Sequence, residues 1–169
     1  AGPIKVLIAV GAPDEGNTRS TVLDYERELQ NILDAVEVAQ RRLREMNPDV
    51  AVEALALSVT SGTAHRVVEG MTVVVDGLDR FEPRYALNQA CVDRKVPYVF
   101  AGALGSVGNM TTIIPGKTPC LECVLGGIDD TLPTCATVGI HPSVLGVIAS
   151  LQVSEAMRLI LGEPPSLAN

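Results

Sequence analysis

Two aspartates follow one of the most apolar runs of the sequence. Met71–Val75 reads MTVVV and predicts a buried strand, and Asp76 and Asp79 come directly after it. In an open α/β sheet, ligands bind beyond the carboxyl ends of the strands. One aspartate could cap the helix that follows, but a cap accounts for one of them and not for both. We therefore expect Asp76 and Asp79 at a ligand or cofactor site.

Cys120 and Cys123 form a Cys-x-x-Cys motif inside a long irregular segment, residues 115–134. Loops of this length in compact domains are usually functional or tied by a metal. Two thiolates alone do not close a tetrahedral zinc site, so the motif predicts partial zinc binding or a free or oxidised thiol pair. Cys135 follows, and it is either a nucleophile, with His141 near enough to lower its pKa, or a small buried residue.

Gly11 and Gly16 stand in a turn-rich segment directly after Ile4–Val10, an aliphatic run that predicts the first strand. Glycines in this place can cradle the phosphates of a nucleotide. Pro13, however, stands where a dinucleotide-binding loop has its middle glycine, and two acidic residues before Gly16 add negative charge. The segment fits an acidic surface loop better than a phosphate-binding loop.

Helical and strand patterns alternate along the chain, as in an α/β fold. Apolar residues recur at helical spacing from Val22 to Met46, with charged residues on the opposite face. The alternation VAVEALAL over Val50–Leu57 predicts a strand. Further along, we expect a short helix over Ala64–Glu69, a helix over Arg84–Val92, two antiparallel strands over Val96–Ala103 and Gly105–Ile114, and a last helix that opens at His141 and ends at Gly162.

Composition limits the class of protein. The chain has 169 residues, enough for one domain with a real core, and 47% are hydrophobic but 3% aromatic. Such a core consists of Val, Ile, Leu and Ala, as in a buried parallel sheet. The net charge of −7 argues against binding to nucleic acid or anionic membranes. No run reaches the roughly 18 apolar residues that span a bilayer. The cysteine usage fits a reducing cytoplasm.

From Val36 to Pro164 the sequence resembles the ThiF/MoeB/HesA group of the ubiquitin-activating-enzyme-like superfamily. The matching pieces are VEVAQRRLREMNPDVAVEAL, VVVDGLDRFEPRYALNQACV, GSVGNMTTIIPGKTPCLEC and PTCATVGIHPSVLGVIASLQVSEAMRLILG. The resemblance implies a homodimer that uses ATP and Mg²⁺. It also implies adenylation of the C-terminus of a ubiquitin-like sulfur-carrier protein.

The resemblance assigns roles to single residues. Asp79 matches the family's aspartate near the triphosphate and its Mg²⁺, and Arg84 falls on a family-typical position that would lie near the phosphates. Cys120 and Cys123 match the first half of a four-cysteine zinc site, whose second half the family places beyond the last helix. Cys135 matches the cysteine that some members use as a nucleophile.

The first 35 residues fit the family less well. They resemble the opening strand and helix of a CHAT domain, a caspase-like fold, which points to a fusion with a seam near residues 34–36. Aligning VLDYERELQN with the family's second strand places Asp24 on the aspartate that binds the ribose. The same alignment puts Ala35 where the family has a lysine, so we expect a degraded ATP site.

The sequence thus predicts a single three-layer, Rossmann-like α/β domain whose mainly parallel sheet carries an antiparallel extension, with residues 163–169 as a tail. Two functions remain open. One is a carrier-protein adenylyltransferase that uses Mg-ATP. The other is a catalytically inactive dimeric scaffold, or protein-binding module, that keeps the fold.

Overall fold

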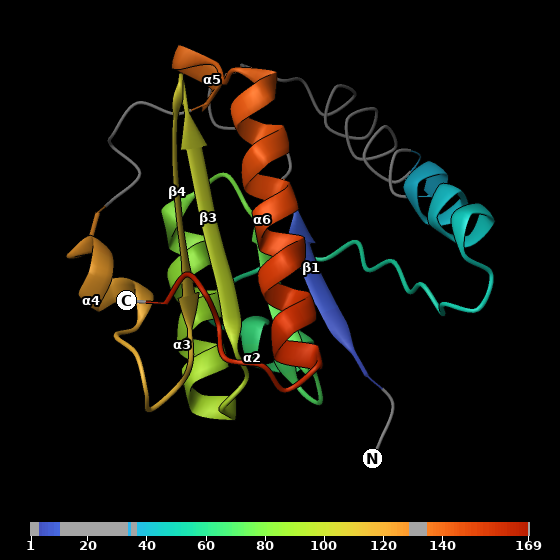
Figure 1. The fold of residues 1–169 in the computed structure, drawn as a ribbon, viewed down its shortest axis with the longest axis horizontal. Helices are drawn as coiled ribbons and strands as arrows, with labels where there is room; N and C mark the ends of the chain where they lie inside the picture. The colour runs from blue at the N-terminus through green and yellow to red at the C-terminus, as the bar shows by residue number, and fades with distance from the viewer. Residues whose placement is uncertain (1–3, 11–33, 35–36, 129–134, 169) are drawn as a thin grey trace. The chain divides into compact units, whose positions relative to one another are not determined.

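The structure is a computed structural model that describes residues 4–10, 34, 37–128 and 135–168 (Figure 1). The chain divides into two compact units, one formed by Ala1–Gly11 with Val59–Asn169 and the other by Ala12–Ser58. The expectation of one domain with a seam near residues 34–36 stays a prediction.

A four-stranded sheet with the order β1-β2-β3-β4 forms the centre of the first unit. β1 (Val6–Val10) pairs in parallel with β2 (Val73–Gly77), which pairs in parallel with β3 (Tyr98–Leu104). β4 (Val107–Ile113) folds back on β3 as its antiparallel partner. Valine and isoleucine fill most of the paired positions of β1 and β2, as suits the pleated surface of a buried sheet. The predicted Rossmann-like class with an antiparallel extension is confirmed.

Two helices cover one face of the sheet. α2 (Ala64–Val68) and α3 (Phe81–Arg94) lie behind the strands in Figure 1. Tyr98 is fully buried between β3 and these helices, and Leu87 of α3 is buried in the same cluster. Other members of this core are Ala64, Val67, Val68, Val74, Ala90, Cys91, Val96, Phe100 and Ile113. This larger cluster fixes α3 against β2 and β3.

Among the described residues, the long helix α6 (Pro142–Ile160) covers the other face of the sheet and lies in front of the strands in Figure 1. Ala156 packs there against Val73, Val75 and Val99 of the sheet. The approach to β4 is so close that a Cβ built on Gly108 would lie 2.7 Å from Cγ1 of Ile148. Glycine suits this contact, since a methyl group would force the side chain of Ile148, or the helix that carries it, to shift.

α6 also holds the segment that follows it. The carboxylate of Glu155 is buried and accepts hydrogen bonds from the hydroxyl of Thr112, at 2.8 Å, and from the backbone N–H groups of Ser166 and Leu167. The carbonyl of Leu167 accepts the N–H of Thr112 at 2.6 Å. Ser166 and Leu167, within the predicted tail, are thereby held beside β4.

Two short helices complete the first unit. α4 (Leu121–Leu125) lies inside the segment expected to be irregular, and α5 (Cys135–Val138) precedes α6. Leu121 explains the position of α4, because its side chain is fully buried in the core cluster against α3.

The second unit corrects one prediction. Residues 37–46 are helical, as the periodicity predicted, but residues 50–58 carry no strand assignment. A strand needs a neighbour that accepts its backbone hydrogen bonds, and none pairs with Val50–Leu57 in the described part of the chain. Its alternating side chains are accordingly mostly exposed, Leu55 at 57%.

Among the described residues, α6 is the one helix long and apolar enough to cross a membrane by length and composition alone. The sequence has no uninterrupted apolar run of this length. α6 nevertheless qualifies, because its mean hydropathy is high although polar residues stand among the apolar ones. In the structure α6 packs on β2, β3 and β4, and 17% of its most apolar 18-residue stretch is buried.

Replacing Glu155 by alanine is expected to lower the free energy of unfolding by about 1–3 kcal/mol, because the buried hydroxyl of Thr112 and two part-buried N–H groups lose their acceptor. Glu155→Gln keeps one acceptor oxygen and should cost less. Chemical denaturation measures both, and amide hydrogen exchange at Ser166 and Leu167 reports the tail directly. Unchanged protection of these two amides in Glu155→Ala would show that the carboxylate does not hold the tail.

Candidate functional site

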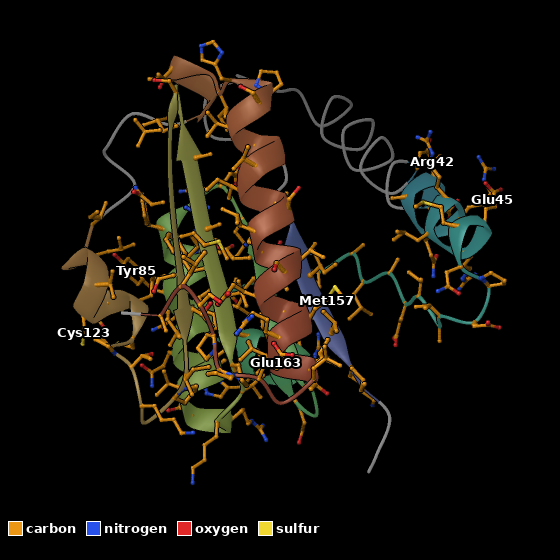
Figure 2. The ribbon with its side chains drawn as sticks, viewed as in Figure 1. Arg42, Glu45, Tyr85, Cys123, Met157 and Glu163 are labelled. Atoms are coloured by element: carbon orange, nitrogen blue, oxygen red, sulfur yellow. The ribbon has the colours of Figure 1, made fainter. Side chains whose placement is uncertain are left out.

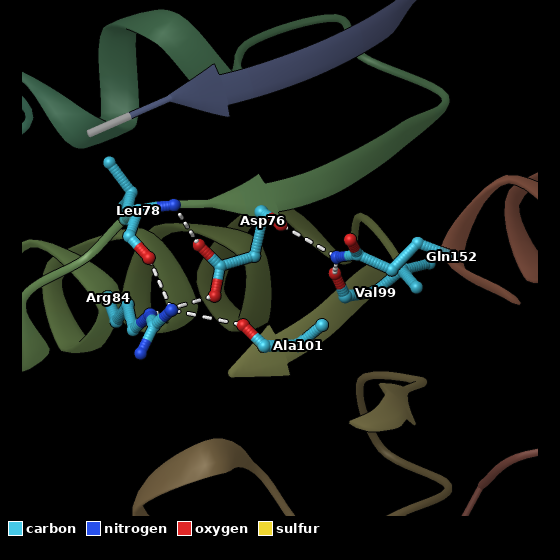
Figure 3. A network of polar contacts seen from close by, with 6 residues as sticks. All are labelled: Asp76, Leu78, Arg84, Val99, Ala101 and Gln152. Carbon is cyan, nitrogen blue, oxygen red and sulfur yellow. Dashed lines mark hydrogen bonds and ion pairs between the residues drawn. The ribbon is translucent and has the colours of Figure 1, made fainter. Parts of the chain in front are cut away.

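A buried ion pair lies at the end of β2. Oδ2 of Asp76 is 3.0 Å from Nε of Arg84, in the first turns of α3 (Figure 3). The two side chains are 0% and 9% exposed. A buried charge costs free energy unless it is paired and hydrogen-bonded. Each residue therefore constrains the other, and the strand end is tied to the helix.

Backbone groups hydrogen-bond two further polar atoms of the pair, one on each side chain. Oδ1 of Asp76 accepts the N–H of Leu78 at 2.8 Å. Nη2 of Arg84 donates to the carbonyl oxygens of Leu78 and of Ala101, the latter at 3.0 Å. The guanidinium also lies 5.2 Å from the centre of the Phe100 ring. These contacts join β2, the turn after it, α3 and β3 at one point.

Burial controls the protonation of this centre. Desolvation raises the pKa of Asp76 to about 6, and the attraction of Arg84 opposes the rise without cancelling it. The neighbouring Tyr98 is fully buried, and burial followed by the charge of Asp76 raises its pKa well above the ordinary value. The Asp76 carboxyl therefore takes up a proton in weakly acidic solution.

Gln152 of α6 reaches the same region from the other face of the sheet (Figure 3). Its Nε2 donates to the carbonyl of Asp76 at 2.6 Å and to that of Val99 at 3.2 Å. The β2–β3 pairing ends at Val75 and Val99, so the amide bridges two strands where they separate. Gln152 was not predicted from the sequence. Its position in the sequence could have indicated that it is buried, because it stands in the apolar stripe of the last helix, four positions from both Ile148 and Ala156.

Asp79 has a different setting from Asp76. It lies in the turn between β2 and α3 and is exposed, whereas Asp76 is 2% exposed and engaged with Arg84 and Leu78. Of the two predicted carboxylates, Asp79 is the one that a cation in solvent could reach. Arg84 is buried too, so its guanidinium acts inside the fold.

Asn88 connects α3 to the cysteine pair. Its Oδ1 accepts the N–H of Leu121 at 3.0 Å, which fixes the start of α4. Sγ of Cys120 and Sγ of Cys123 lie 3.6 Å apart. Hydrogen bonding by the N–H of Cys123 lowers the pKa of Cys120, and the Cys120 sulfur raises the pKa of Cys123. The structure brings together the two thiols that the motif predicts.

These residues do not make a zinc site by themselves. Within the part of the chain that the structure describes, no group of three or more His, Cys, Asp or Glu side chains could hold a metal ion. A closed zinc site needs four ligands, and the pair supplies two. Zinc binding by Cys120 and Cys123 is therefore not supported.

Cys135 is the first residue of α5, and its side chain lies outside the described part. His141 caps the start of α6, and its N–H donates to the carbonyl of Gly105 at 2.9 Å. Both positions lie beside the β3–β4 turn, at the carboxyl end of the parallel strands (Figure 1). Cys135 and Asp79 thus belong to the same end of the sheet. The role of Cys135 as a nucleophile stays a prediction.

Gly11, Gly16 and Asp24, predicted to contact the nucleotide, lie outside the described residues. Their roles also stay predictions, and so does the likeness of residues 1–35 to a CHAT domain.

The sequence pattern of the ThiF family matches residues 33–169. The chain belongs to the ThiF family. This match includes β2, α3, the cysteine pair and α6, so the elements that build the candidate site are those of the family.

Curated relatives agree with this membership. The chain is 36% identical over 148 residues to the sulfur carrier protein ThiS adenylyltransferase of Bacillus subtilis, a match that covers 87% of this chain and 44% of the relative. It is 37% identical to the SAMP-activating enzyme E1 of Haloferax volcanii, over 78% of this chain and 49% of that protein. The chain therefore spans about half the length of these relatives.

Solved structures share the fold. A crystal structure of E. coli MccB with ATP has a TM-score of 0.62 and 23% sequence identity, covering 96% of this chain and 50% of that one. The structure of E. coli MccB with succinimide has a TM-score of 0.65 at 21% identity, covering 96% of this chain and 50% of that one. At these identities the likeness establishes the fold alone.

The stability contributed by Asp76 is expected to fall as the pH rises. The pKa is about 6 in the folded chain and near 3.8 in the unfolded one, so the folded state binds more protons between these values. Wild type should gain roughly 3 kcal/mol or less, relative to Asp76→Asn, when the pH is lowered from 7 to 4. Urea denaturation across this range measures the difference, and ¹³C NMR titration of the Asp76 carboxyl measures the pKa itself. A carboxyl that titrates below pH 4 would contradict the assignment.

Proposed function

We propose that this chain supplies the nucleotide- and Mg²⁺-binding part of an enzyme that adenylates the C-terminus of a ubiquitin-like sulfur-carrier protein. The observation that carries the proposal is the exposed Asp79, which follows the buried Asp76–Arg84 pair at the carboxyl end of β2. Membership of the ThiF family and relatives named sulfur carrier protein adenylyltransferases support it.

The proposed reaction joins two anions. A carboxylate oxygen of the carrier attacks the α-phosphorus of ATP, and the bond from that phosphorus to the oxygen bridging to the β-phosphate breaks. The products are an acyl-adenylate and pyrophosphate. Mg²⁺, when bound, would offset the charge of the phosphates, and a carboxylate such as Asp79 is the ligand it prefers.

Arg84 is assigned a positioning role in this proposal. Its guanidinium contacts Asp76 and two carbonyl groups and is buried, so it acts on the phosphates through the geometry of the turn. That turn carries Asp79, whose carboxylate must keep a fixed place for catalysis by orientation. Cys135, at the same end of the sheet, remains the proposed acceptor of the activated carrier.

The loop sequence after β1 favours a second candidate, a catalytically inactive scaffold. Pro13 and the acidic residues beside it replace glycine where phosphates would be held, and Ala35 stands at the position of the family's lysine. Loss of one such stabilising group costs about 2.7–4 kcal/mol of transition-state stabilisation in measured cases. A chain lacking several of them would bind partners without adenylating them.

Carrier-dependent exchange of labelled pyrophosphate into ATP distinguishes the two functions. We expect exchange in wild type and a loss of at least about a hundredfold in Asp79→Asn, because the ligand for the metal is removed. Asp93→Asn is the matched control, since it removes an exposed carboxylate from the far end of α3 and should leave exchange unchanged. No exchange and no heat of binding in wild type at millimolar Mg-ATP would establish the scaffold.

We also propose that two copies of the chain associate. A homodimer is what the family resemblance implies, and the outer face of α6 supports it. Met157 lies on this face and at the surface of the first unit (Figure 2). Large apolar side chains on or beside α6 that are 40–69% exposed are Leu145, Val147, Leu151, Val153, Met157 and Leu161. An exposed apolar patch of this kind marks a contact surface.

Met157→Glu is expected to shift the association equilibrium toward the monomer, because it places a charge in an apolar contact. Gln89→Glu is the control, because it adds the same charge at an exposed position of α3, on the other face of the sheet. Sedimentation velocity over a range of concentrations measures the change. A wild-type chain that sediments as a monomer throughout would contradict the dimer.

A further inference from the structure

The positive charges of the first unit are divided unevenly between the two ends of its sheet. The carboxyl ends of β1, β2 and β3 point the same way, as the arrowheads of β1 and β3 show in Figure 1. Asp79 lies beyond that end, and in the proposed function the phosphates of ATP lie there as well. A polyphosphate is stabilised by cationic groups. The position of each arginine and lysine therefore decides whether it could meet the nucleotide.

Most of the basic residues that the structure describes in this unit belong to the opposite, amino end of the parallel strands. β4 ends opposite Tyr98, the first residue of β3. The last residue of α3, Arg94, forms an ion pair of 3.2 Å with Glu69, directly after α2. The final turns of α6 lie at this end too, because Ala156 packs against Val73, the first residue of β2. The arginine and lysine residues at the amino end are Lys5, Arg66, Arg94, Lys95, Lys117 and Arg158.

Arg80 lies at the other end of the sheet. It follows Asp79 directly, it is exposed, and α3 begins with the next residue. Arg84, the other arginine near this end, is buried and engaged with Asp76 and two backbone carbonyl groups. Among the described residues of the first unit, Arg80 is therefore the one exposed arginine or lysine at the carboxyl end of the parallel strands.

We propose that Arg80 binds the phosphates of the nucleotide directly and is a further catalytic residue of the adenylation. This inference rests on the proposed function. A guanidinium is planar and donates parallel hydrogen bonds to two phosphate oxygens, so an arginine suits this task. The 14-residue helix α3 begins beside Arg80, and the positive end of its dipole favours the same anion.

The charges around Arg80 suit a nucleotide that carries Mg²⁺. Asp79 and Glu82 are exposed carboxylates on either side of Arg80 in the sequence, and they would repel a free polyphosphate. Asp79 would hold the metal, and Arg80 would contact the phosphate oxygens. As the bond from the α-phosphorus to the bridging oxygen breaks, negative charge passes to the departing pyrophosphate. The guanidinium offsets that charge without transferring a proton.

Isothermal titration of the whole chain with Mg-ATP and with adenosine tests this role. Arg80→Ala is expected to weaken the binding of Mg-ATP at least about tenfold, because charge-assisted hydrogen bonds to the phosphates are lost. The binding of adenosine should not change, since adenosine has no phosphate. Arg80→Lys keeps the charge without the paired donors, so it should bind Mg-ATP more tightly than Arg80→Ala does.

Arg66→Ala is the matched control, because it removes the same charge from an exposed position at the amino end and should bind Mg-ATP as wild type does. Unchanged binding of Mg-ATP in Arg80→Ala would overturn the role of Arg80 and leave the adenylation proposal standing. An equal loss in Arg66→Ala, or an equal loss of adenosine binding, would also overturn it, because net charge or the fold would then explain the effect. A wild-type chain that binds no Mg-ATP would overturn the proposed function, and the role of Arg80 with it.

Discussion

The buried ion pair of Asp76 and Arg84 is the constraint on which the site depends. Neither charge could be buried alone, and together they draw on Leu78 and Ala101 for the rest of their hydrogen bonds. Breaking such a pair by removing one partner leaves an uncompensated charge. The pair therefore fixes the end of β2 relative to the start of α3 and to the carbonyl of Ala101 in β3. The exposed Asp79 lies in the turn between β2 and α3, so its position is fixed by the same contacts.

Polar groups on α6 extend the same principle to the other face of the sheet. Gln152 bridges β2 and β3 where their pairing stops, and Glu155 fixes the residues after the helix to β4. A helix packed through valine and alanine alone could slide on a flat apolar sheet. Hydrogen bonds at two points give it a single register, since each buried amide or carboxylate must find its partners.

The sequence predicts best the helices, whose backbone hydrogen bonds are local, and the strands whose side chains are buried in the core. Short aliphatic runs and helical spacing predicted β2, α3 and the β3–β4 hairpin. The resemblance to the ThiF group predicted the family, and the family match over residues 33–169 confirms it. Val50–Leu57 shows the limit, because an alternating pattern cannot reveal whether a neighbouring strand exists. For the same reason the sequence did not reveal the burial of Asp76. Asp76 and Asp79 stand three positions apart, and what distinguishes them is the ion pair of Asp76 with Arg84, a contact between separate elements of the fold.

The pairing of β1 with β2 has a consequence for the order of folding. The N–H of Lys5 donates to the hydroxyl of Thr72 across 67 positions of sequence, while β2, α3, β3 and β4 follow one another closely along the chain. Contacts between distant segments pay a larger loop-closure entropy than local ones. We therefore expect the local β2-to-β4 segment to form before β1 adds to its edge. Late pairing of β1 would limit the rate at which the sheet is completed. It would not change the topology, which the β2-to-β4 segment already sets.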